Sequence, residues 1–212
     1  MQPVDLALVI VLDCSASVTF DEFGLMAGGC GAALRDPDVQ AGLLGGPHGA
    51  SLGALLLFSG PDDQAVSVPW SRIGSPGTLE QFATDVENAE RMVRATSTAI
   101  GAALRAAADL LDGLPAPASR RVIDVVGDGR ANDGPAPAPI RDRLAEAGIT
   151  INGLCVLHEE PDLVDSFTRE VIGGPAAFAL PCPDYPAFAD AMRQKLQREI
   201  AGLAPNRSRR PA

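Results

Sequence analysis

Lysine is almost absent from this sequence, because Lys195 is the single lysine among 17 basic residues in a chain of 212. The 27 acidic residues give a formal net charge of −10 at pH 7. Binding to nucleic acid or to an anionic membrane depends on clustered Lys and Arg, and the basic cluster of this chain is the terminal group Arg207, Arg209 and Arg210. We therefore expect neither nucleic acid nor an anionic membrane surface as a partner.

The sequence also lacks a long hydrophobic run. The longest runs, at 6–12 and 52–58, are far shorter than the roughly 20 residues that cross a bilayer. The first five residues contain no basic segment, and Asp5 comes before the first apolar run, which is unlike a signal peptide. We expect no membrane insertion, and a cytoplasmic location unless the chain is a trimmed form of a secreted protein.

The chain has few cysteines, and their spacing does not match a metal-binding motif. The four cysteines, Cys14, Cys30, Cys155 and Cys182, form no CxxC pair, so a cysteine-based zinc site is not expected. Without a secretion signal, the thiols should be reduced and mostly buried.

Apolar runs alternate with amphipathic segments along most of the chain. Val4–Asp13 is a continuous apolar run closed by an acid, which is typical of a strand buried on both faces. The other predicted strands are 51–58, 64–70, 121–127, 149–157 and 177–180. The predicted helices are 20–35, 79–93, 98–114, 140–147, 163–172 and 188–203, and residues 41–50 are predicted to form a loop.

Strands separated by helices require crossover connections, which predict a mostly parallel sheet covered on both faces. The short link 59–63 is a hairpin signal, so one edge strand should be antiparallel. The predicted fold class is therefore α/β, with a doubly wound, mostly parallel, six-stranded sheet and one antiparallel edge strand. We expect a single domain over residues 1–204 and a flexible tail over 205–212.

Polar side chains follow two of the predicted strands. The first strand ends in an Asp-x-Ser-x-Ser sequence at 13–17, and a later strand ends at Asp128. Thr98 is predicted to begin the helix between them. In an open parallel sheet, sites form beyond the carboxyl ends of strands where the strand order reverses, so these residues should meet at one rim.

These residues are hard oxygen donors, which suit Mg²⁺, Mn²⁺ or Ca²⁺. Residues two apart in an extended loop point the same way, so Asp13, Ser15 and Ser17 can converge on one ion. With only two carboxylates, the ion keeps residual positive charge and an open position, which favours an external carboxylate as its last ligand. Asp124 lies about 13 Å from Asp128 at strand rise, too far for the same ion, and is expected to be a buried acid hydrogen-bonded to backbone.

Together these features resemble the metal-ion-dependent adhesion site of von Willebrand factor A domains. The order of elements is similar to that family over 4–200, and stretches at 21–23, 120–125, 148–153 and 171–175 resemble an uncharacterised bacterial branch of it. The resemblance implies a Rossmann-like fold and a metal site formed by Asp13, Ser15, Ser17, Thr98 and Asp128.

Two positions within this resemblance need comment. Thr98 fits the family pattern Thr-x-x-Gly-x-Ala-Leu best, but Thr96 fits a Thr-x-Thr pattern, so the threonine is left open. Gly127 stands where the family more often has Thr or Ser. This change lies beside the ligands and should not abolish binding.

The favoured function is a metal-dependent protein-interaction module that is not an enzyme. It would bind an acidic side chain of another protein through Mg²⁺, or through Mn²⁺ or Ca²⁺. A purely structural interpretation, in which Asp13 and Ser15 only cap a turn, would suit an isolated Asp-x-Ser-x-Ser sequence. It fits less well when Thr98 and Asp128 follow in the order that the motif requires.

Two alternatives remain. The first is a Mg²⁺-dependent phosphoryl-transfer enzyme with Asp13 as nucleophile, but Ser15 stands where a second acid is needed and Lys195 is the single lysine. The second is a scaffold whose metal site is vestigial. A nucleotide-binding domain is disfavoured because no GxGxxG follows the first strand and no GxxxxGK[ST] occurs, and a serine hydrolase because no histidine is suitably placed.

Overall fold

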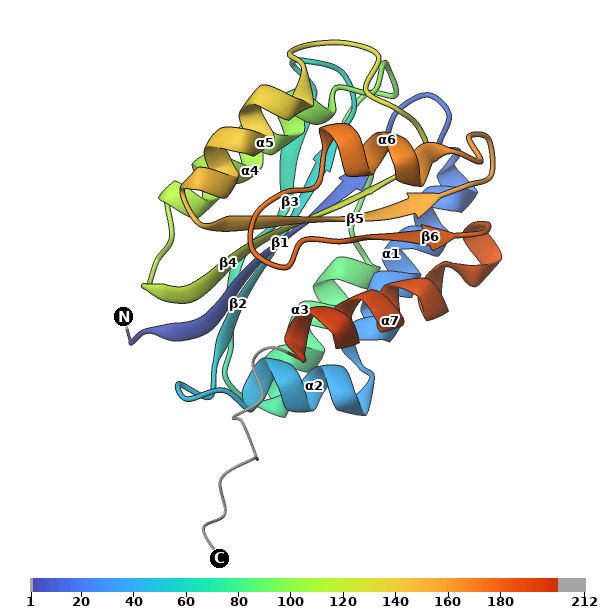
Figure 1. Cartoon of the computed structure of the whole chain (residues 1–212). Helices are drawn as coiled ribbons and strands as arrows, with labels where there is room; N and C mark the ends of the chain where they lie inside the picture. Colours follow the sequence, from blue (N-terminus) through green and yellow to red (C-terminus); the bar gives the residue numbers. More distant parts are fainter. Residues whose placement is uncertain (1, 202–212) are drawn as a thin grey trace, which may run out of the picture.

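The computed structural model describes residues 2–201 and builds one sheet from its strands (Figure 1). The strands are β1 (Val4–Asp13), β2 (Ser51–Phe58), β3 (Gln64–Ile73), β4 (Ala118–Gly127), β5 (Ile149–Val156) and β6 (Ala179–Cys182). Their order in the sheet is β3-β2-β1-β4-β5-β6. β2 pairs antiparallel with β3, and the other neighbours pair in parallel. The predicted sheet is confirmed, and the predicted tail at 205–212 lies outside the described residues.

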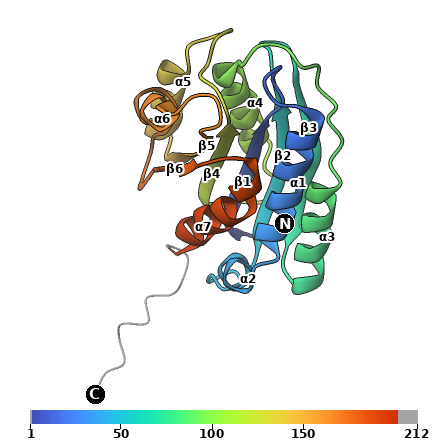
Figure 2. The same cartoon turned by 90° about the vertical axis from the view of Figure 1, so that its right-hand side faces the viewer.

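Helices cover both faces of the sheet. Within the described range they are α1 (Phe20–Leu34), α2 (Pro37–Leu44), α3 (Pro76–Glu87), α4 (Ile100–Asp112), α5 (Pro137–Glu146), α6 (Leu163–Glu170) and α7 (Phe188–Ile200). α1, α2, α3 and α7 lie on one face, while α4, α5 and α6 lie on the other (Figure 2). None of the helices within residues 2–201 is long and apolar enough to cross a membrane.

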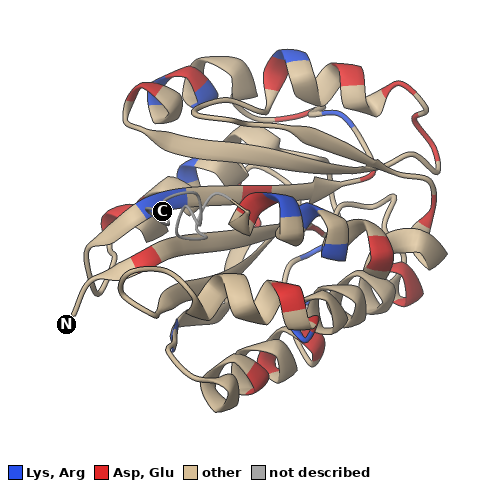
Figure 3. Cartoon of the chain, turned by 60° about the horizontal axis from the view of Figure 1, so that its bottom comes forward, with Lys and Arg blue, Asp and Glu red and all other residues tan. Residues whose placement is uncertain are grey.

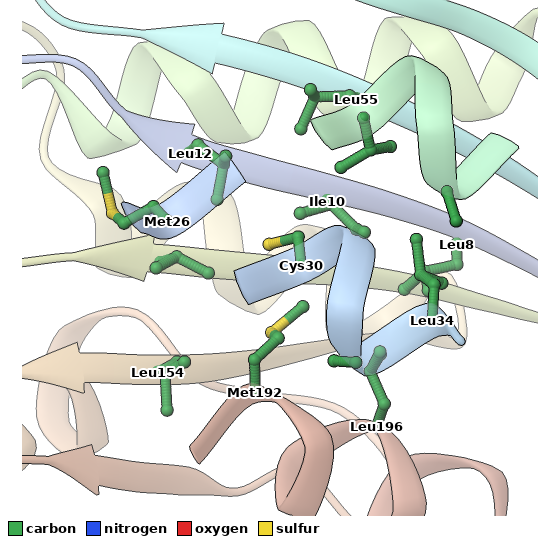
Figure 4. Packing of buried hydrophobic residues seen from close by; sticks show 14 of the residues in the cluster. Leu8, Ile10, Leu12, Met26, Cys30, Leu34, Leu55, Leu154, Met192 and Leu196 are labelled. Carbon is green, nitrogen blue, oxygen red and sulfur yellow. The ribbon is translucent and has the colours of Figure 1, made fainter. Parts of the chain in front are cut away.

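β1 forms the centre of the core, because both of its faces are covered. All ten of its residues are buried. Leu8, Ile10 and Leu12 face α1 and α7 (Figure 4), whereas Val9 and Val11 belong to the core on the α4 side. Burying one such side chain contributes roughly 1.5–3 kcal/mol, so the continuous apolar run holds the end of β1 firmly in place.

Charged residues lie mostly on helices and connecting segments (Figure 3).

The structure corrects the prediction of a loop at 41–50, because the first part of this range is helical. α2 extends to Leu44, and residues 45–50 connect it to β2. Asp36 accepts hydrogen bonds from the backbone nitrogens of Asp38 and Val39, and Pro37 takes the first helical position. The Asp-Pro pair therefore starts a helix as well as ending one, because proline needs no hydrogen-bond acceptor there.

Three further elements differ from their predicted bounds, two of them near the predicted site. The helix predicted at 79–93 is α3, which Ser75 caps and which ends at Glu87. Residues 88–99 are therefore not helical, and they pass beside the β1–α1 loop (Figure 2). α4 begins at Ile100 with Ala99 as its cap residue, so Thr98 precedes that helix instead of opening it. β6 lies two residues later than predicted.

Candidate metal centre

The two predicted carboxylates lie at the point where the strand order reverses. β1 has β2 on one side and β4 on the other, and the chain crosses between these halves after β3. Asp13 is the last residue of β1, and Asp128 follows the last residue of β4. The register pairs Leu12 with Val126, so both acids emerge at the same end of the sheet.

Hydrogen bonds join four of the five predicted ligands into one cluster. The backbone N–H of Ser15 donates to Asp13 Oδ1 at 2.7 Å. The hydroxyl oxygens of Ser15 and Ser17 are 3.2 Å apart, and Ser17 Oγ donates to Asp128 Oδ1 at 2.9 Å. The structure therefore brings Asp13, Ser15, Ser17 and Asp128 together from the β1–α1 loop and the end of β4.

Asp13 carries the least satisfied group of this cluster. Its side chain is fully buried, and its Oδ2 has no hydrogen-bond partner among the described residues. Burial raises the pKa of Asp13 to about 7, and the nearby charge of Asp128 also raises it, against the hydrogen bonds from Ser15 and the charge of Arg91. A buried carboxylate with a bare oxygen beside a second carboxylate is satisfied by a proton or by a cation, so these residues fit a bound metal ion.

The two candidate threonines differ in how their hydroxyls are used. Thr96 is exposed, and its Oγ1 donates to Asp63 Oδ2 at 3.3 Å and lies 3.1 Å from Ser59 Oγ. Thr98 is buried, its backbone N–H donates to Asn132 Oδ1 at 2.8 Å, and no hydrogen bond involves its hydroxyl within residues 2–201. Thr98 is therefore the better candidate ligand on geometry.

Two glycines shape the surroundings of the site. A Cβ at Gly101 would collide with the carbonyl oxygen of Pro135, which explains the glycine three residues after Thr98. A Cβ at Gly127 would lie 3.1 Å from Asp13 Oδ2. The absence of a side chain at Gly127 therefore leaves space beside the bare oxygen of Asp13.

Three residues at the site were missed by the sequence analysis. Tyr185 donates its hydroxyl proton to Asp128 Oδ2 at 3.0 Å, and burial together with the charge of Asp128 raises the pKa of Tyr185 so that it stays a donor. Arg91 Nη2 donates to the carbonyl oxygens of Cys14 and Ser15 at 2.8 and 3.0 Å. Asn132 donates its backbone N–H to Thr98 O at 3.0 Å. Only the rarity of tyrosine, one in the chain, was a signal.

Other reactive groups are remote or inert. Residues 49–53 match the Gly-x-Ser-x-Gly pattern of hydrolases, but Ser51 is buried at the start of β2 and donates its hydroxyl proton to Leu43 O. The four cysteines are free and buried, and burial raises the pKa of Cys14 to about 12. Residues 2–201 contain no cluster of three His, Cys, Asp or Glu side chains able to hold a metal. Any ion at this rim therefore depends on hydroxyls in addition to two carboxylates.

Solved structures share this fold. Proximal thread matrix protein 1 from the mussel byssus is 15% identical with a TM-score of 0.67, over 93% of this chain and 46% of that one. A von Willebrand factor type A structure from Catenulispora acidiphila is 15% identical with a TM-score of 0.62, over 93% and 43%. The von Willebrand domain of the type V pilus tip protein Mfa5 from Porphyromonas gingivalis is 11% identical with a TM-score of 0.64, over 97% and 98%. The chain thus spans less than half of the first two.

The class of fold is therefore that of von Willebrand factor A domains. The chain belongs to the bacterial family described as protein of unknown function DUF1194, which matches residues 3–204. No curated protein matches the sequence. The mussel protein has also been solved with zinc in its metal-ion-dependent adhesion site, at 16% identity and a TM-score of 0.65.

Proposed function

We propose that this domain binds another protein through a divalent cation held at the carboxyl ends of β1 and β4. The observation that carries the proposal is the bare, buried Oδ2 of Asp13. The other oxygen of this carboxylate accepts the backbone N–H of Ser15, and the hydroxyls of Ser15 and Ser17 continue the cluster to Asp128. Asp13, Ser15, Ser17, Thr98 and Asp128 would hold the ion. Adhesion and matrix proteins among the structures of like fold support an interaction role.

Each residue has a distinct part in this proposal. The two carboxylates supply negative charge, and the hydroxyls supply neutral oxygen donors that suit Mg²⁺ better than a soft metal. Tyr185 and Arg91 orient Asp128 and the β1–α1 loop without being ligands. The bound ion would act as a Lewis acid that accepts a carboxylate oxygen from an Asp or Glu of the partner.

Calorimetric titration with Mg²⁺ should show one weak site, and Asp128→Asn should weaken it by tenfold or more. Asparagine keeps the shape of the side chain but removes one of only two charges at the site. Asp133→Asn is the matched control, because Asp133 is an exposed acid of the neighbouring loop that accepts a hydrogen bond from Ser97. Unchanged Mg²⁺ affinity in Asp128→Asn would show that the ligand set is wrong.

Mn²⁺ and Ca²⁺ titrations of the same proteins identify the preferred ion.

Phosphatase activity is expected to stay at background when p-nitrophenyl phosphate is added with Mg²⁺. Ser15 occupies the place of the second acid, and Lys195 is fully buried in an ion pair with Asp124, so it is not free to hold a phosphoryl group. A Mg²⁺-dependent hydrolysis that disappears in Asp13→Asn would instead favour the phosphoryl-transfer alternative.

A further inference from the structure

An exposed aromatic ring lies immediately after the candidate metal loop. Phe20 begins α1, three residues after Ser17, and its side chain is 77% exposed. Among residues 2–201 the other large exposed apolar side chains, Leu25, Val66 and Met92, are 40–56% exposed. Neither capping nor packing requires a phenyl group at this position, because Thr19 and Glu22 already form the capping box of α1.

Arg91 connects this ring to the metal loop. Its guanidinium carbon lies 5.1 Å from the centroid of the Phe20 ring, and its Nη2 donates to the carbonyls of Cys14 and Ser15. The same side chain thus contacts Phe20 and the backbone at Cys14 and Ser15, which directly follow the candidate ligand Asp13. The ring therefore belongs to the rim of the candidate metal centre and not to a separate surface.

The charge around the rim differs between its two sides. Arg94, three residues after Arg91, is 85% exposed and forms an ion pair with Asp63 at 3.4 Å. On the Asp128 side, Arg130 is neutralised by ion pairs with Glu160 and Asp162. Arg91, by contrast, donates to backbone carbonyls and forms no ion pair with an acid among residues 2–201. An acidic segment approaching a protein of net charge −10 therefore meets an uncompensated cation next to Phe20.

We propose that Phe20, held in place by Arg91, forms an apolar subsite that selects partner segments carrying a large apolar side chain next to the coordinating Asp or Glu. The inference rests on the proposed function and specifies its partner. The aliphatic or aromatic neighbour of the acid covers the ring of Phe20, while Arg91 holds the ring and the metal loop at a fixed spacing. Burying part of a phenyl ring under such a side chain strengthens binding without any further charge.

Two short peptides test this subsite in solution. Ac-Gly-Asp-Gly-NH₂ offers the carboxylate alone, and Ac-Leu-Asp-Leu-NH₂ offers it with apolar neighbours. In ¹⁵N NMR titrations with saturating Mg²⁺, the leucine peptide should bind about tenfold more tightly than the glycine peptide. Phe20→Ala should bring this ratio close to one, while leaving the Mg²⁺ titration and the affinity for the glycine peptide unchanged.

Leu25→Ala is the matched control, because it removes another exposed apolar side chain of α1, and it should keep the tenfold ratio. Phe20→Leu should keep part of it. A ratio that persists in Phe20→Ala, or is absent in the unaltered protein while the glycine peptide binds with Mg²⁺, overturns the subsite alone. Failure of both peptides to bind, or equal binding in EDTA, overturns the metal-bridge function together with the subsite.

Discussion

Replacing Lys195 with methionine is expected to destabilise the protein by about 3–5 kcal/mol, the usual cost of breaking a buried ion pair from one side. Lys195 is fully buried between α7 and β4, where it forms an ion pair with Asp124 and lies 3.4 Å from Glu199 Oε2. Burial alone lowers the pKa of Lys195, but the charges of Asp124 and Glu199 outweigh it and raise the pKa. The lysine is therefore charged, and methionine would leave Asp124 without a counter-ion.

The remaining groups around Lys195 cannot replace that charge. Apart from the ammonium group of Lys195, no hydrogen-bond donor among the described residues reaches either carboxylate oxygen of Asp124. Glu199 accepts a hydrogen bond from Asn152 Nδ2 at 2.8 Å, and burial and the charge of Asp124 raise its pKa to about 8. Glu199 thus has a second partner in Asn152, whereas Asp124 depends on Lys195 alone.

Chemical denaturation of Lys195→Met and of the double variant Lys195→Met/Asp124→Leu measures this dependence. The double variant should regain most of the lost free energy of unfolding, because it removes the charge that the single variant strands in the core. A loss below about 1 kcal/mol in the single variant would mean that Asp124 is not held as a buried anion. Arg193→Met is the matched control, since Arg193 pairs with Asp190 on the solvent side of α7.

This cluster marks a limit of sequence reasoning. The pattern of β4 predicted that Asp124 would be buried, which the structure confirms, but the expected backbone partner was wrong. Its partner lies 71 positions later in the chain, on a helix whose rotation about its axis decides which side chains enter the core. No local pattern around Asp124 or Lys195 encodes that pairing.

The sheet was predictable because its signals are local. Val4–Asp13 is apolar without interruption since both of its faces are covered, and the five-residue link at 59–63 fixes an antiparallel neighbour. The positions of Asp13 and Asp128 were predictable because each residue stands at the end of a predicted strand. Their bonds to Ser15 and Ser17 could be anticipated from alternation within an extended loop.

The supporting contacts of the candidate site were not predictable in the same way. Arg91 was assigned to a helix, and only the end of α3 at Glu87 frees residues 88–99 to cross the rim. Tyr185 reaches Asp128 from the turn before α7, 57 positions away in the chain. These contacts depend on how segments from opposite ends of the sequence meet above the sheet.

Without metal, Asp13→Asn should stabilise the protein at pH 8 by up to about 4 kcal/mol, a bound set by a pKa difference of roughly three units. Burial is the largest cause of the raised pKa of Asp13, from 3.8 to about 7. Because the folded state holds this proton more tightly than the unfolded state, the free energy of unfolding falls as pH rises from about 4 to about 7. Asparagine does not titrate, so that loss disappears, and its Oδ1 still accepts the hydrogen bond from Ser15.

Added Mg²⁺ should narrow the difference in stability between the two proteins, because it should stabilise the unaltered protein more than Asp13→Asn. A cation bound only by the folded state raises its stability by about 1.4 kcal/mol for each tenfold excess over Kd, and the proposed site needs the Asp13 charge to bind it. Denaturation of both proteins in EDTA and in Mg²⁺, at pH 5 and pH 8, separates the two effects. Glu199, whose pKa is also raised, contributes a slope of the same sign to both proteins, so their difference isolates Asp13.

If the free energy of unfolding changes equally with pH in both proteins in EDTA, Asp13 is not an acid with a raised pKa. Equal stabilisation of both proteins by Mg²⁺ would place the ion elsewhere, even if the slopes differ. The expected pattern, in which asparagine is the more stable residue without metal and the less responsive one with it, requires that the buried carboxylate be kept for the ion. A scaffold with a vestigial site would gain stability from the substitution and lose nothing in Mg²⁺.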